Sequence, residues 1–340
     1  MLSGKVLAAV GMPFAVAAAF GGILVSTNHT IFPAFRPPAD YLSASAPVAK
    51  VAACMRAETR FAGIAVNQLQ SSPGQLQPSP VTTYHHITTS PLAVLEIYNS
   101  FPGKFDSGAA LQAVKLNALP LIQLNPGKLK PKVIQEIASG RYDKNIKNYA
   151  DQVRGFKRCI AISLGHEMNG WWYRWGQHWN TPATFIKAWR RVHTIFAQEG
   201  ATNVIWSWDP SHQYQQVTPT KIATPAKEWY PGAKYVNWIG LDGYLGSDNN
   251  RHLQSFDEIF GFQLHDIKQF APHKLVYLAE TGVNPGPSAA RQVTELFAGA
   301  LAYHLAGLVW FDAVAKHDYR LGIHKDEDMA YQNAVKGFVG

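Results

Sequence analysis

Short apolar segments recur along the chain after residue 60, and each is long enough to form one buried strand. They are rich in Val, Ile, Leu and aromatic residues and are apolar on both faces. This pattern is typical of parallel strands covered on both sides rather than of half-exposed antiparallel strands. Eight such segments occur, at residues 61–66, 92–98, 119–124, 159–164, 204–208, 236–241, 275–279 and 307–311.

Helical signals occupy the intervals between these segments. Thr181 and Pro182 are suited to the cap and the first turn of a helix that Gly200 ends, and apolar residues recur between them at three- and four-residue steps. The same pattern predicts a helix over residues 288–305. Strand and helix alternating eight times predict an α/β protein with a (β/α)8 (TIM) barrel. A doubly wound open sheet is the alternative, and it is less favoured because no dinucleotide-binding glycine pattern is present.

Polar residues follow the apolar segments at the point where each predicted strand ends. In a barrel these ends meet at one face, where barrel enzymes build their active sites. A single residue of this kind would be a helix cap, but polar residues at all eight strand ends, including two glutamates that cap poorly, indicate a polar pocket. The residues are Asn67, Asn99, Ser100, Asn125, His166, Glu167, Asp209, Asp242, Glu280 and Asp312.

Two of these residues, Glu167 and Glu280, follow the fourth and the seventh predicted strand. These strands lie on opposing sides of an eight-stranded barrel, so the two side chains can converge across its mouth. Hydrolysis of a glycosidic bond needs one carboxylic acid and one carboxylate arranged in this way. A solvated loop position is the alternative for either residue. However, both stand among Trp, Tyr and Gly, where an unpaired carboxylate costs free energy unless it has a task.

Two motifs around these glutamates resemble those of a known enzyme family. Residues 165–176 (GHEMNGWWYRWG) resemble the acid/base motif of glycoside hydrolase family 26, and residues 277–282 (YLAETG) resemble its nucleophile motif. Residues 206–210, 230–244 and 309–321 are also similar, so that the resemblance covers roughly residues 60–325. The family consists of retaining (β/α)8 glycosidases that include β-mannanases and groups acting on mixed-linkage β-glucan or β-1,3-xylan.

The resemblance implies a retaining β-glycoside hydrolase with Glu167 as proton donor and Glu280 as nucleophile. Its substrate would be a β-linked polysaccharide or oligosaccharide, with β-1,4-mannan as the first choice. Three other substrates stay open, because the loops after the first three strands carry no pattern assignable to mannan. They are mixed-linkage β-glucan, β-1,3-xylan and an exopolysaccharide of the cell itself. No cofactor and no metal ion are expected.

The resemblance also implies five substrate-binding residues. His166 would form a hydrogen bond in the subsite for the sugar that is cleaved, and Trp172 and Trp310 would be aromatic platforms there. Tyr244 would orient the nucleophile. Asp242 is similar to an acidic residue that the family often has two positions before that tyrosine.

Barrel proteins of other functional classes have different residues at these positions. A non-catalytic carbohydrate-binding barrel would keep the tryptophans but usually lose one of the two glutamates, and this chain keeps both. An aldolase needs a lysine on a strand, and a metal-dependent hydrolase needs pairs of histidines. His166 is the only histidine at a predicted strand end.

The N-terminus has the pattern of an export element. Lys5 precedes an uncharged, largely apolar run at residues 6–25, which is long enough to span a bilayer. Residues 1–30 are therefore predicted to be a signal peptide or a membrane anchor, 31–55 a linker and 56–340 the barrel. A buried core helix is the alternative for the apolar run. The protein would be exported, either secreted or anchored to the outer face of the cytoplasmic membrane, with no other membrane contact.

Charge and aromatic content narrow the choice of partner. The formal charge is +8, but lysines and arginines are scattered, with no run longer than Arg190 and Arg191. Nucleic acid is therefore not an expected partner. Ten Trp and fourteen Tyr exceed the needs of a core and suit stacking on sugar rings. The three tryptophans at residues 171, 172 and 175 cannot all be buried easily. A monomer is expected.

The two cysteines, Cys54 and Cys159, do not have the spacing of a metal site. One disulfide in an oxidising compartment and two unpaired buried thiols are both compatible with the sequence.

Overall fold

A computed structural model of the protein describes Cys54 and residues 60–67, 79–127, 132–212, 225–248 and 252–340. The predicted export segment (1–30) lies outside these residues, as does the predicted linker (31–55) apart from Cys54. None of the helices in the described part of the chain is both long and apolar enough to cross a membrane.

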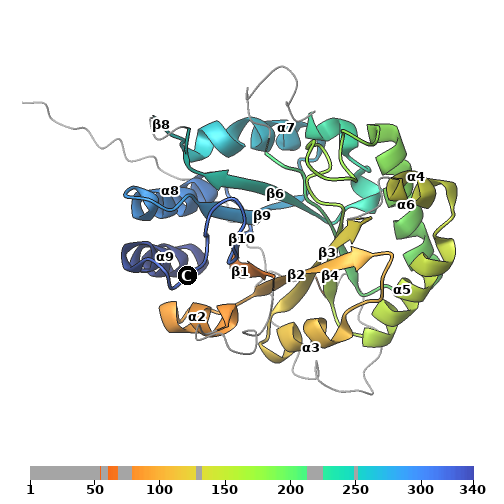
Figure 1. The fold of residues 1–340 in the computed structure, drawn as a ribbon, viewed down its shortest axis with the longest axis horizontal. Coiled ribbons are helices and arrows are strands. Elements are labelled where there is room, and N and C mark those ends of the chain that lie inside the picture. Colours follow the sequence, from red (N-terminus) through yellow and green to blue (C-terminus); the bar gives the residue numbers. More distant parts are fainter. Residues whose placement is uncertain (1–53, 55–59, 68–78, 128–131, 213–224, 249–251) are drawn as a thin grey trace, which may run out of the picture. The chain divides into compact units, whose positions relative to one another are not determined.

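Eight parallel strands close into a barrel, which confirms the predicted fold (Figure 1). Going around it, the strands follow the order β1-β10-β9-β6-β5-β4-β3-β2, so that the last strand pairs with the first. Four strands extend further toward their carboxyl ends than the apolar segments predict, because their polar ends stay in the sheet. The strands are β1 (Phe61–Val66), β2 (Val94–Phe101), β3 (Leu119–Pro126), β4 (Ile160–Leu164), β5 (Val204–Trp208), β6 (Trp238–Leu245), β9 (Leu275–Val283) and β10 (Gly307–Phe311).

Helices surround the strands on the outside of the barrel (Figure 1). They are α2 (Pro80–Ile87), α3 (Ser107–Lys115), α4 (Val133–Ser139), α5 (Asp143–Phe156), α6 (Pro182–Gln198), α7 (Phe262–Phe270), α8 (Ala289–Ala302) and α9 (Lys325–Val339). Short 3-10 turns at Ala226–Trp229 and Ala233–Tyr235, a π turn at Asp257–Gly261 and an antiparallel ribbon of β7 (Ser247–Asp248) and β8 (His252–Leu253) complete the described elements. Helix α6 begins as predicted, with the Thr181 hydroxyl accepting the backbone N–H of Thr184 at 3.3 Å.

The buried apolar residues form two clusters, one on each side of the barrel wall. The larger cluster joins the outer face of the strands to the helices. The smaller one contains strand and loop residues together with the two cysteines, and it fills the barrel interior. Three aromatic rings fill its lower end, where Phe61 stacks on Trp238 at 5.8 Å and lies 5.6 Å from Tyr277. These rings close the amino-terminal end of the described barrel interior, and the buried polar side chains lie toward the carboxyl ends of the strands.

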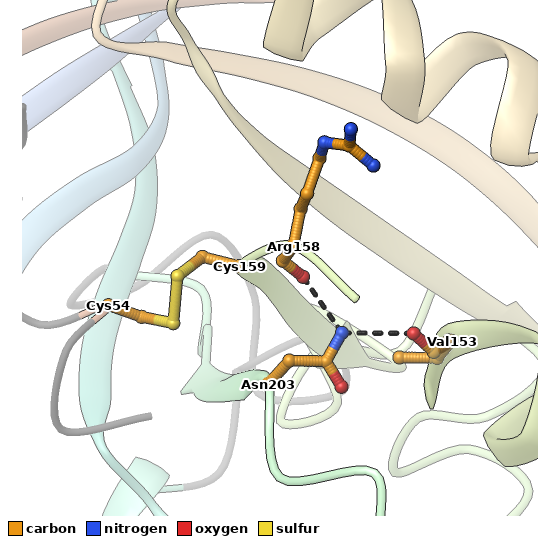
Figure 2. Close-up of a disulfide and its surroundings, with 5 residues drawn as sticks. All are labelled: Cys54, Val153, Arg158, Cys159 and Asn203. Atoms are coloured by element: carbon orange, nitrogen blue, oxygen red, sulfur yellow. Dashed lines mark hydrogen bonds between the residues drawn. A yellow bond between two sulfur atoms is a disulfide. The ribbon is translucent and has the colours of Figure 1, made fainter. Parts of the chain in front are cut away.

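A disulfide joins Cys54 to Cys159, just before β4, with 5.5 Å between the Cα atoms (Figure 2). The sequence is compatible with a disulfide and with two unpaired thiols, and the structure contains the disulfide. Beside it, the side-chain amide of Asn203 donates to the carbonyls of Arg158 (2.8 Å) and Val153 (2.9 Å). The amino-terminal end of β4 is therefore fixed both covalently and by hydrogen bonds.

Removing the disulfide should lower the free energy of unfolding. The two cysteines are 105 residues apart, and closing a loop of about 100 residues restricts the unfolded chain by up to about 4.7 kcal/mol. We expect the variant Cys54→Ala/Cys159→Ala to lose roughly 3 to 5 kcal/mol in urea denaturation. Dithiothreitol should destabilise the wild type to a similar extent and leave the variant unchanged. Equal stability of the two proteins under oxidising conditions would contradict a stabilising role.

Candidate active site

Above the apolar filling, the interior of the barrel is polar. The strand positions concerned are two residues apart, as expected for side chains on one face of a strand. These residues are Glu96 and Tyr98 on β2, Gln123 on β3, Ser163 on β4, Ser207 on β5 with Asp209 directly after it, Asp242 and Tyr244 on β6, and Glu280 on β9. The loop after β4 adds Glu167 to this polar layer.

Two tyrosine hydroxyls hold the carboxylate of Glu280, which is only 8% exposed. Tyr98 donates to Oε2 at 2.5 Å, and Tyr244 donates to Oε1. The contact expected between Tyr244 and Glu280 is thus present, whereas the contact from Tyr98 was not predicted. With one donor on each oxygen, the carboxylate is fixed in orientation and its charged form is stabilised.

The loop after β4 places Glu167 through an unusual backbone conformation. Glu167 has a φ of 51°, in the left-handed region that costs free energy for a residue with a side chain. Its backbone N–H donates to the carbonyl of Asp209 at 2.7 Å. Two residues further on, the Asn169 side chain exchanges hydrogen bonds of 2.9 and 3.0 Å with the backbone of Ser211. The loop after β4 is thereby fastened to the end of β5, which keeps Glu167 in place.

Trp172 contacts Glu167 directly. Its indole N–H donates to Glu167 Oε2 at 2.6 Å, and the ring is 43% exposed. The close fold of the loop depends on Gly170, because a Cβ there would lie 2.5 Å from the Trp172 ring. The predicted substrate-binding tryptophan is thus beside the predicted proton donor and in contact with solvent.

The two glutamates differ in how readily they release a proton. Burial, and after it the charge of Glu280, raises the pKa of Glu167 to about 8. Burial also raises the pKa of Glu280, but the hydrogen bonds from Tyr244 and Tyr98 act against this shift. Around neutral pH, Glu167 is therefore the group that keeps its proton. Glu280 is the one stabilised as a carboxylate, which is the difference that acid and nucleophile require.

Three further acids lie in the same layer. Asp209 accepts hydrogen bonds from Gln123 (3.1 Å) and Ser207 (2.5 Å). Glu96 and Asp242 are fully buried, and burial together with the charge of Glu280 raises the pKa of both well above the usual range. Among the described residues, no cluster of His, Cys, Asp and Glu side chains is arranged to hold a metal ion.

His166 lies at the side of this layer, enclosed by aromatic rings. Its ring centre is 4.9 Å from that of Tyr173, 5.5 Å from Trp175 and 6.0 Å from Tyr98. Burial lowers the pKa of His166 to about 3, so that the imidazole is neutral. Within the described part of the chain neither ring nitrogen has a hydrogen-bond partner. A neutral imidazole of this kind can donate to one hydroxyl and accept from another.

The tryptophans of the β4 loop divide into a buried and an exposed set. Trp175 is buried, stacks on Tyr173 at 4.3 Å and donates its N–H to the carbonyl of His166 at 2.6 Å. Trp171 and Trp172 are exposed and lie edge to face with 6.0 Å between ring centres. The expectation that not all three could be buried is confirmed.

Trp310 does not lie where the family resemblance implied. It is fully buried, its N–H donates to the carbonyl of Tyr319 at 2.8 Å, and its ring packs against Tyr331 of α9. A ring without exposed surface has no face to offer a sugar, so the platform assignment was wrong for Trp310. Side chains alternate along a strand, and the inward position belongs to the next residue, Phe311, which packs against Tyr244 at 6.1 Å between ring centres.

Some residues at the strand ends are structural. Asn99 accepts the hydroxyl of Tyr149 at 2.6 Å and so ties β2 to α5. Asp312 accepts the backbone N–H of Leu321 at 2.8 Å and shapes the loop after β10. Conversely, sequence reasoning missed Glu96 and Tyr98, which lie within a segment predicted as an apolar strand. Their two-residue spacing, repeated by Asp242 and Tyr244, is the signal that could have found them.

Comparison with known proteins shows to which family the chain belongs. Residues 129–319 match the sequence pattern of glycosyl hydrolase family 26. The chain belongs to this family. The matched range includes the β4 loop with Glu167, both residues of the Asp242–Tyr244 pair, and Glu280.

Similar proteins carry names that point to more than one glycan. Endoglucanase H of Acetivibrio thermocellus is 27% identical in an alignment of 210 residues that covers 59% of this chain and 23% of that protein. The mannan endo-1,4-beta-mannosidase A and B of Caldalkalibacillus mannanilyticus is 37% identical in an alignment of 109 residues that covers 28% of this chain and 20% of that protein. The chain thus spans about a quarter or less of these relatives.

Among solved structures, a modular endo-β-1,4-mannanase from Cellulomonas fimi has the same barrel. The two structures superpose with a TM-score of 0.62 over 81% of this chain and 70% of that one, at 16% sequence identity. At this identity the likeness supports the fold of this family 26 chain.

Replacing Tyr98 by phenylalanine should weaken the nucleophile of the predicted pair. The variant removes one of two donors to Glu280, so that the carboxylate pKa rises and the acidic limb of the pH–activity profile moves to higher pH. A hydrogen bond to a charged group typically contributes enough for a roughly ten- to hundredfold loss of kcat/KM.

Tyr84→Phe is the matched control for this change. Tyr84 is also a buried tyrosine, but its hydroxyl donates to the carbonyl of Pro91, away from the glutamates. The acidic limb of the pH–activity profile of Tyr84→Phe should lie at the same pH as in the wild type. An acidic limb that stays in place in Tyr98→Phe would argue against a role of Tyr98 on Glu280.

Proposed function

We propose that the protein is a retaining β-glycoside hydrolase that cleaves a β-linked polysaccharide, with β-1,4-mannan as the first candidate. One observation carries the proposal. Two tyrosine hydroxyls donate to the carboxylate of Glu280 and favour its charged form, while burial and after it the charge of Glu280 raise the pKa of Glu167 to about 8. A double-displacement glycosidase needs this pair in these two protonation states.

In the first step, Glu280 attacks the anomeric carbon and Glu167 gives its proton to the leaving oxygen. The bond to the leaving sugar breaks as the bond to Glu280 Oε forms. The tyrosine on each oxygen limits rotation of the carboxylate, so that attack occurs from a fixed direction. The second oxygen becomes the carbonyl oxygen of the glycosyl ester and keeps its hydrogen-bond donor.

In the second step, Glu167 is ionised and takes a proton from water, which attacks the same carbon and releases the sugar from Glu280. Formation of the glycosyl ester neutralises Glu280. The charge that raises the pKa of Glu167 is then absent, so its pKa falls. The proton donor of the first step thereby becomes the base of the second, and the overall configuration at the anomeric carbon is retained.

Two other groups have properties suited to the cleaved sugar. His166 is neutral and neither ring nitrogen has a partner in the described part of the chain, but the residue is only 1% exposed, so it can bind a sugar hydroxyl only if the aromatic rings around it make room. Trp172 is exposed and bonded to Glu167, so its ring can lie against a sugar while its N–H holds the acid.

The choice of mannan follows the names of similar proteins. A mannan endo-1,4-beta-mannosidase and an endoglucanase are among the curated relatives, and a β-1,4-mannanase is among the similar structures. Mixed-linkage β-glucan, β-1,3-xylan and an exopolysaccharide of the cell itself are the alternatives. A non-catalytic carbohydrate-binding barrel is the other class of function, and retention of both glutamates with their donors disfavours it.

We also propose that the protein is exported, as a secreted monomer or anchored by residues 6–25. The Cys54–Cys159 disulfide supports this, because structural disulfides persist in oxidising compartments.

A screen of polysaccharides with sizing of the products tests the proposal. The wild type should release short oligosaccharides from β-1,4-mannan or from one of the alternative glycans. Glu280→Ala should keep the melting temperature and lose activity by several orders of magnitude, because no nucleophile remains. Residual activity above about a tenth of wild type would exclude Glu280 as nucleophile. Binding without any product from every glycan would favour the non-catalytic alternative.

The pH dependence should follow Glu167 on the alkaline side. Glu167 must be protonated in the first step, so activity is present below its pKa and is lost as the pH rises through about 8. Glu167→Ala should remove this alkaline limb on aryl glycosides, whose good leaving groups need no proton. Natural substrates should be cleaved very slowly by the same variant.

Added azide separates the roles of the two glutamates. In Glu167→Ala it can replace the activated water and should give a β-configured glycosyl azide, because attack on the glycosyl ester follows one inversion. Formation of the β-azide by Glu280→Ala instead, or of an α-azide by Glu167→Ala, would reverse the two roles.

A further inference from the structure

We propose that Tyr319 is a positioning residue for the nucleophile Glu280 and acts on it through the ring of Tyr244. Tyr319 belongs to the loop after β10 (residues 312–324), which joins this strand to α9. The consequence for catalysis rests on the proposed function, because it needs Glu280 as the nucleophile. The position that Tyr319 gives to Tyr244 does not depend on that function and can be measured without a substrate.

The hydrogen bond from Tyr244 to Glu280 depends on how firmly the Tyr244 ring is held. The side chain is half-buried, and a ring that turns away takes its hydroxyl from Glu280 Oε1. Two neighbouring rings limit this motion. Phe311 meets Tyr244 edge to face with 6.1 Å between ring centres, whereas Tyr319 lies closer, at 4.7 Å with 36° between the ring planes. Tyr319 is therefore the nearer of the two rings that hold the donor in place.

The strand next to Tyr244 leaves a space that the Tyr319 ring fills. Tyr244 pairs with Gly282 of β9, two residues after Glu280, so no side chain lies beside the tyrosine at this position of that strand. A Cβ on Gly282 would lie 3.0 Å from Cδ1 of Tyr319 and 3.4 Å from Cδ1 of Tyr244. The loop after β10 thus supplies the neighbour that β9 lacks at this position.

The loop fixes Tyr319 at its backbone and at its hydroxyl. The carbonyl accepts the Trp310 indole N–H at 2.8 Å, and the backbone N–H donates to the carbonyl of Ala313 at 3.1 Å. The hydroxyl donates to Asn284 Oδ1 at 3.2 Å, and only 5% of the residue is exposed. A ring held in this way has already lost its conformational freedom on folding, so it can support Tyr244 rather than move with it. The buried Trp310 thereby has a role in the site, although it has no exposed face for a sugar.

Tyr319 lies within the electrostatic reach of Glu280, but its own hydroxyl is bonded elsewhere. Burial, and after it the charge of Glu280, raises the pKa of Tyr319 to about 12. The phenol is therefore uncharged at any pH at which the two glutamates work, and its hydroxyl donates to Asn284. Its ring contact with Tyr244 connects it to the nucleophile, which makes the effect on Glu280 an indirect one.

Tyr303 offers a matched control outside the site. Its ring is also tilted against another aromatic ring, with 5.5 Å and 35° to Phe256, and its hydroxyl also donates to a side-chain oxygen, that of Asp257. Tyr303 is more exposed than Tyr319, 39% against 5%, and neither of these two contacts includes Tyr244 or Glu280. Loss of its ring therefore reports what removal of a packed tyrosine does elsewhere in the barrel.

The pKa of Glu280 can be followed directly by NMR in protein labelled with carbon-13 at the glutamate side-chain carboxyl groups. The signal that is missing in Glu280→Gln identifies the group. We expect Tyr319→Leu to raise this pKa by about 0.5 to 1, because Tyr244 is no longer held and donates less to the charged form. Tyr319→Phe keeps the ring and should recover most of the wild-type value. Tyr303→Leu should change the pKa of Glu280 by less than about 0.3.

A double-mutant cycle tests whether Tyr319 acts through Tyr244. Tyr244→Phe removes the donor itself and should raise the pKa of Glu280 by at least as much as Tyr319→Leu does. Once the donor is absent, adding Tyr319→Leu should change this pKa by less than about 0.3 further. On a glycan that the wild type cleaves, Tyr319→Leu should move the acidic limb of kcat/KM to higher pH by the same amount and lower its maximum by about three- to tenfold.

An unchanged pKa of Glu280 in Tyr319→Leu would overturn the proposal. An equal shift in Tyr303→Leu, or a full further shift in the Tyr244→Phe background, would mean that Tyr319 does not act through Tyr244 and would overturn it as well. If Tyr319→Leu does not fold, Trp310→Phe replaces it, because this variant removes the hydrogen bond to the Tyr319 carbonyl. It should give a smaller shift in the same direction, and no shift would overturn the proposal. A wild type that cleaves no glycan, with the NMR shift present, would refute the proposed function and leave the positioning by Tyr319 confirmed.

Discussion

Five carboxyl groups share the upper interior of the barrel, and their burial, together with their mutual repulsion, is the constraint on which the site depends. Glu96, Glu167, Asp209, Asp242 and Glu280 lie in this layer, and no ion pair among the described residues includes any of them. In a medium of low polarity several such groups cannot be charged at once, so most must be neutral. Uncharged hydrogen-bond donors then determine which of the carboxyl groups stays ionised. The carboxyl with a tyrosine hydroxyl on each oxygen, Glu280, is the one best able to keep it.

The barrel and the two glutamates could be predicted from the sequence because both depend on local patterns. Buried strands are apolar on both faces, and their ends are marked by polar residues. The finer placement could not be predicted in the same way. Tyr98 ends a predicted apolar segment, and a single tyrosine suits both a core and a hydrogen bond. Trp310 and Phe311 are adjacent, and only the register of β10 decides which of them faces inward. The pairing of Cys54 with Cys159 depends on a contact across 105 residues, about which their spacing says nothing.

In the segment of residues 166–170 (HEMNG) and just after it, each position has its own structural role. Glu167 takes a left-handed backbone conformation, which costs free energy for a residue with a side chain. Asn169 compensates part of this cost by two hydrogen bonds to the end of β5. Gly170 leaves the space that the Trp172 ring needs to reach the acid. A local strain at Glu167 is thus maintained by contacts on either side, as is common where a side chain must be held for chemistry.

Strand β4 links this strained loop to the covalent bond at the opposite end of the barrel. It has five residues, a length of about 17 Å, with Cys159 directly before it and Glu167 three residues after it. The disulfide and Asn203 fix its amino-terminal end, and the contacts of the β4 loop with Asp209 and Ser211 fix its carboxyl end. Because both ends are held, the position of the acid is set when the chain folds rather than when the substrate binds. Catalysis then needs little reorganisation, since the conformational entropy of the acid has already been lost on folding.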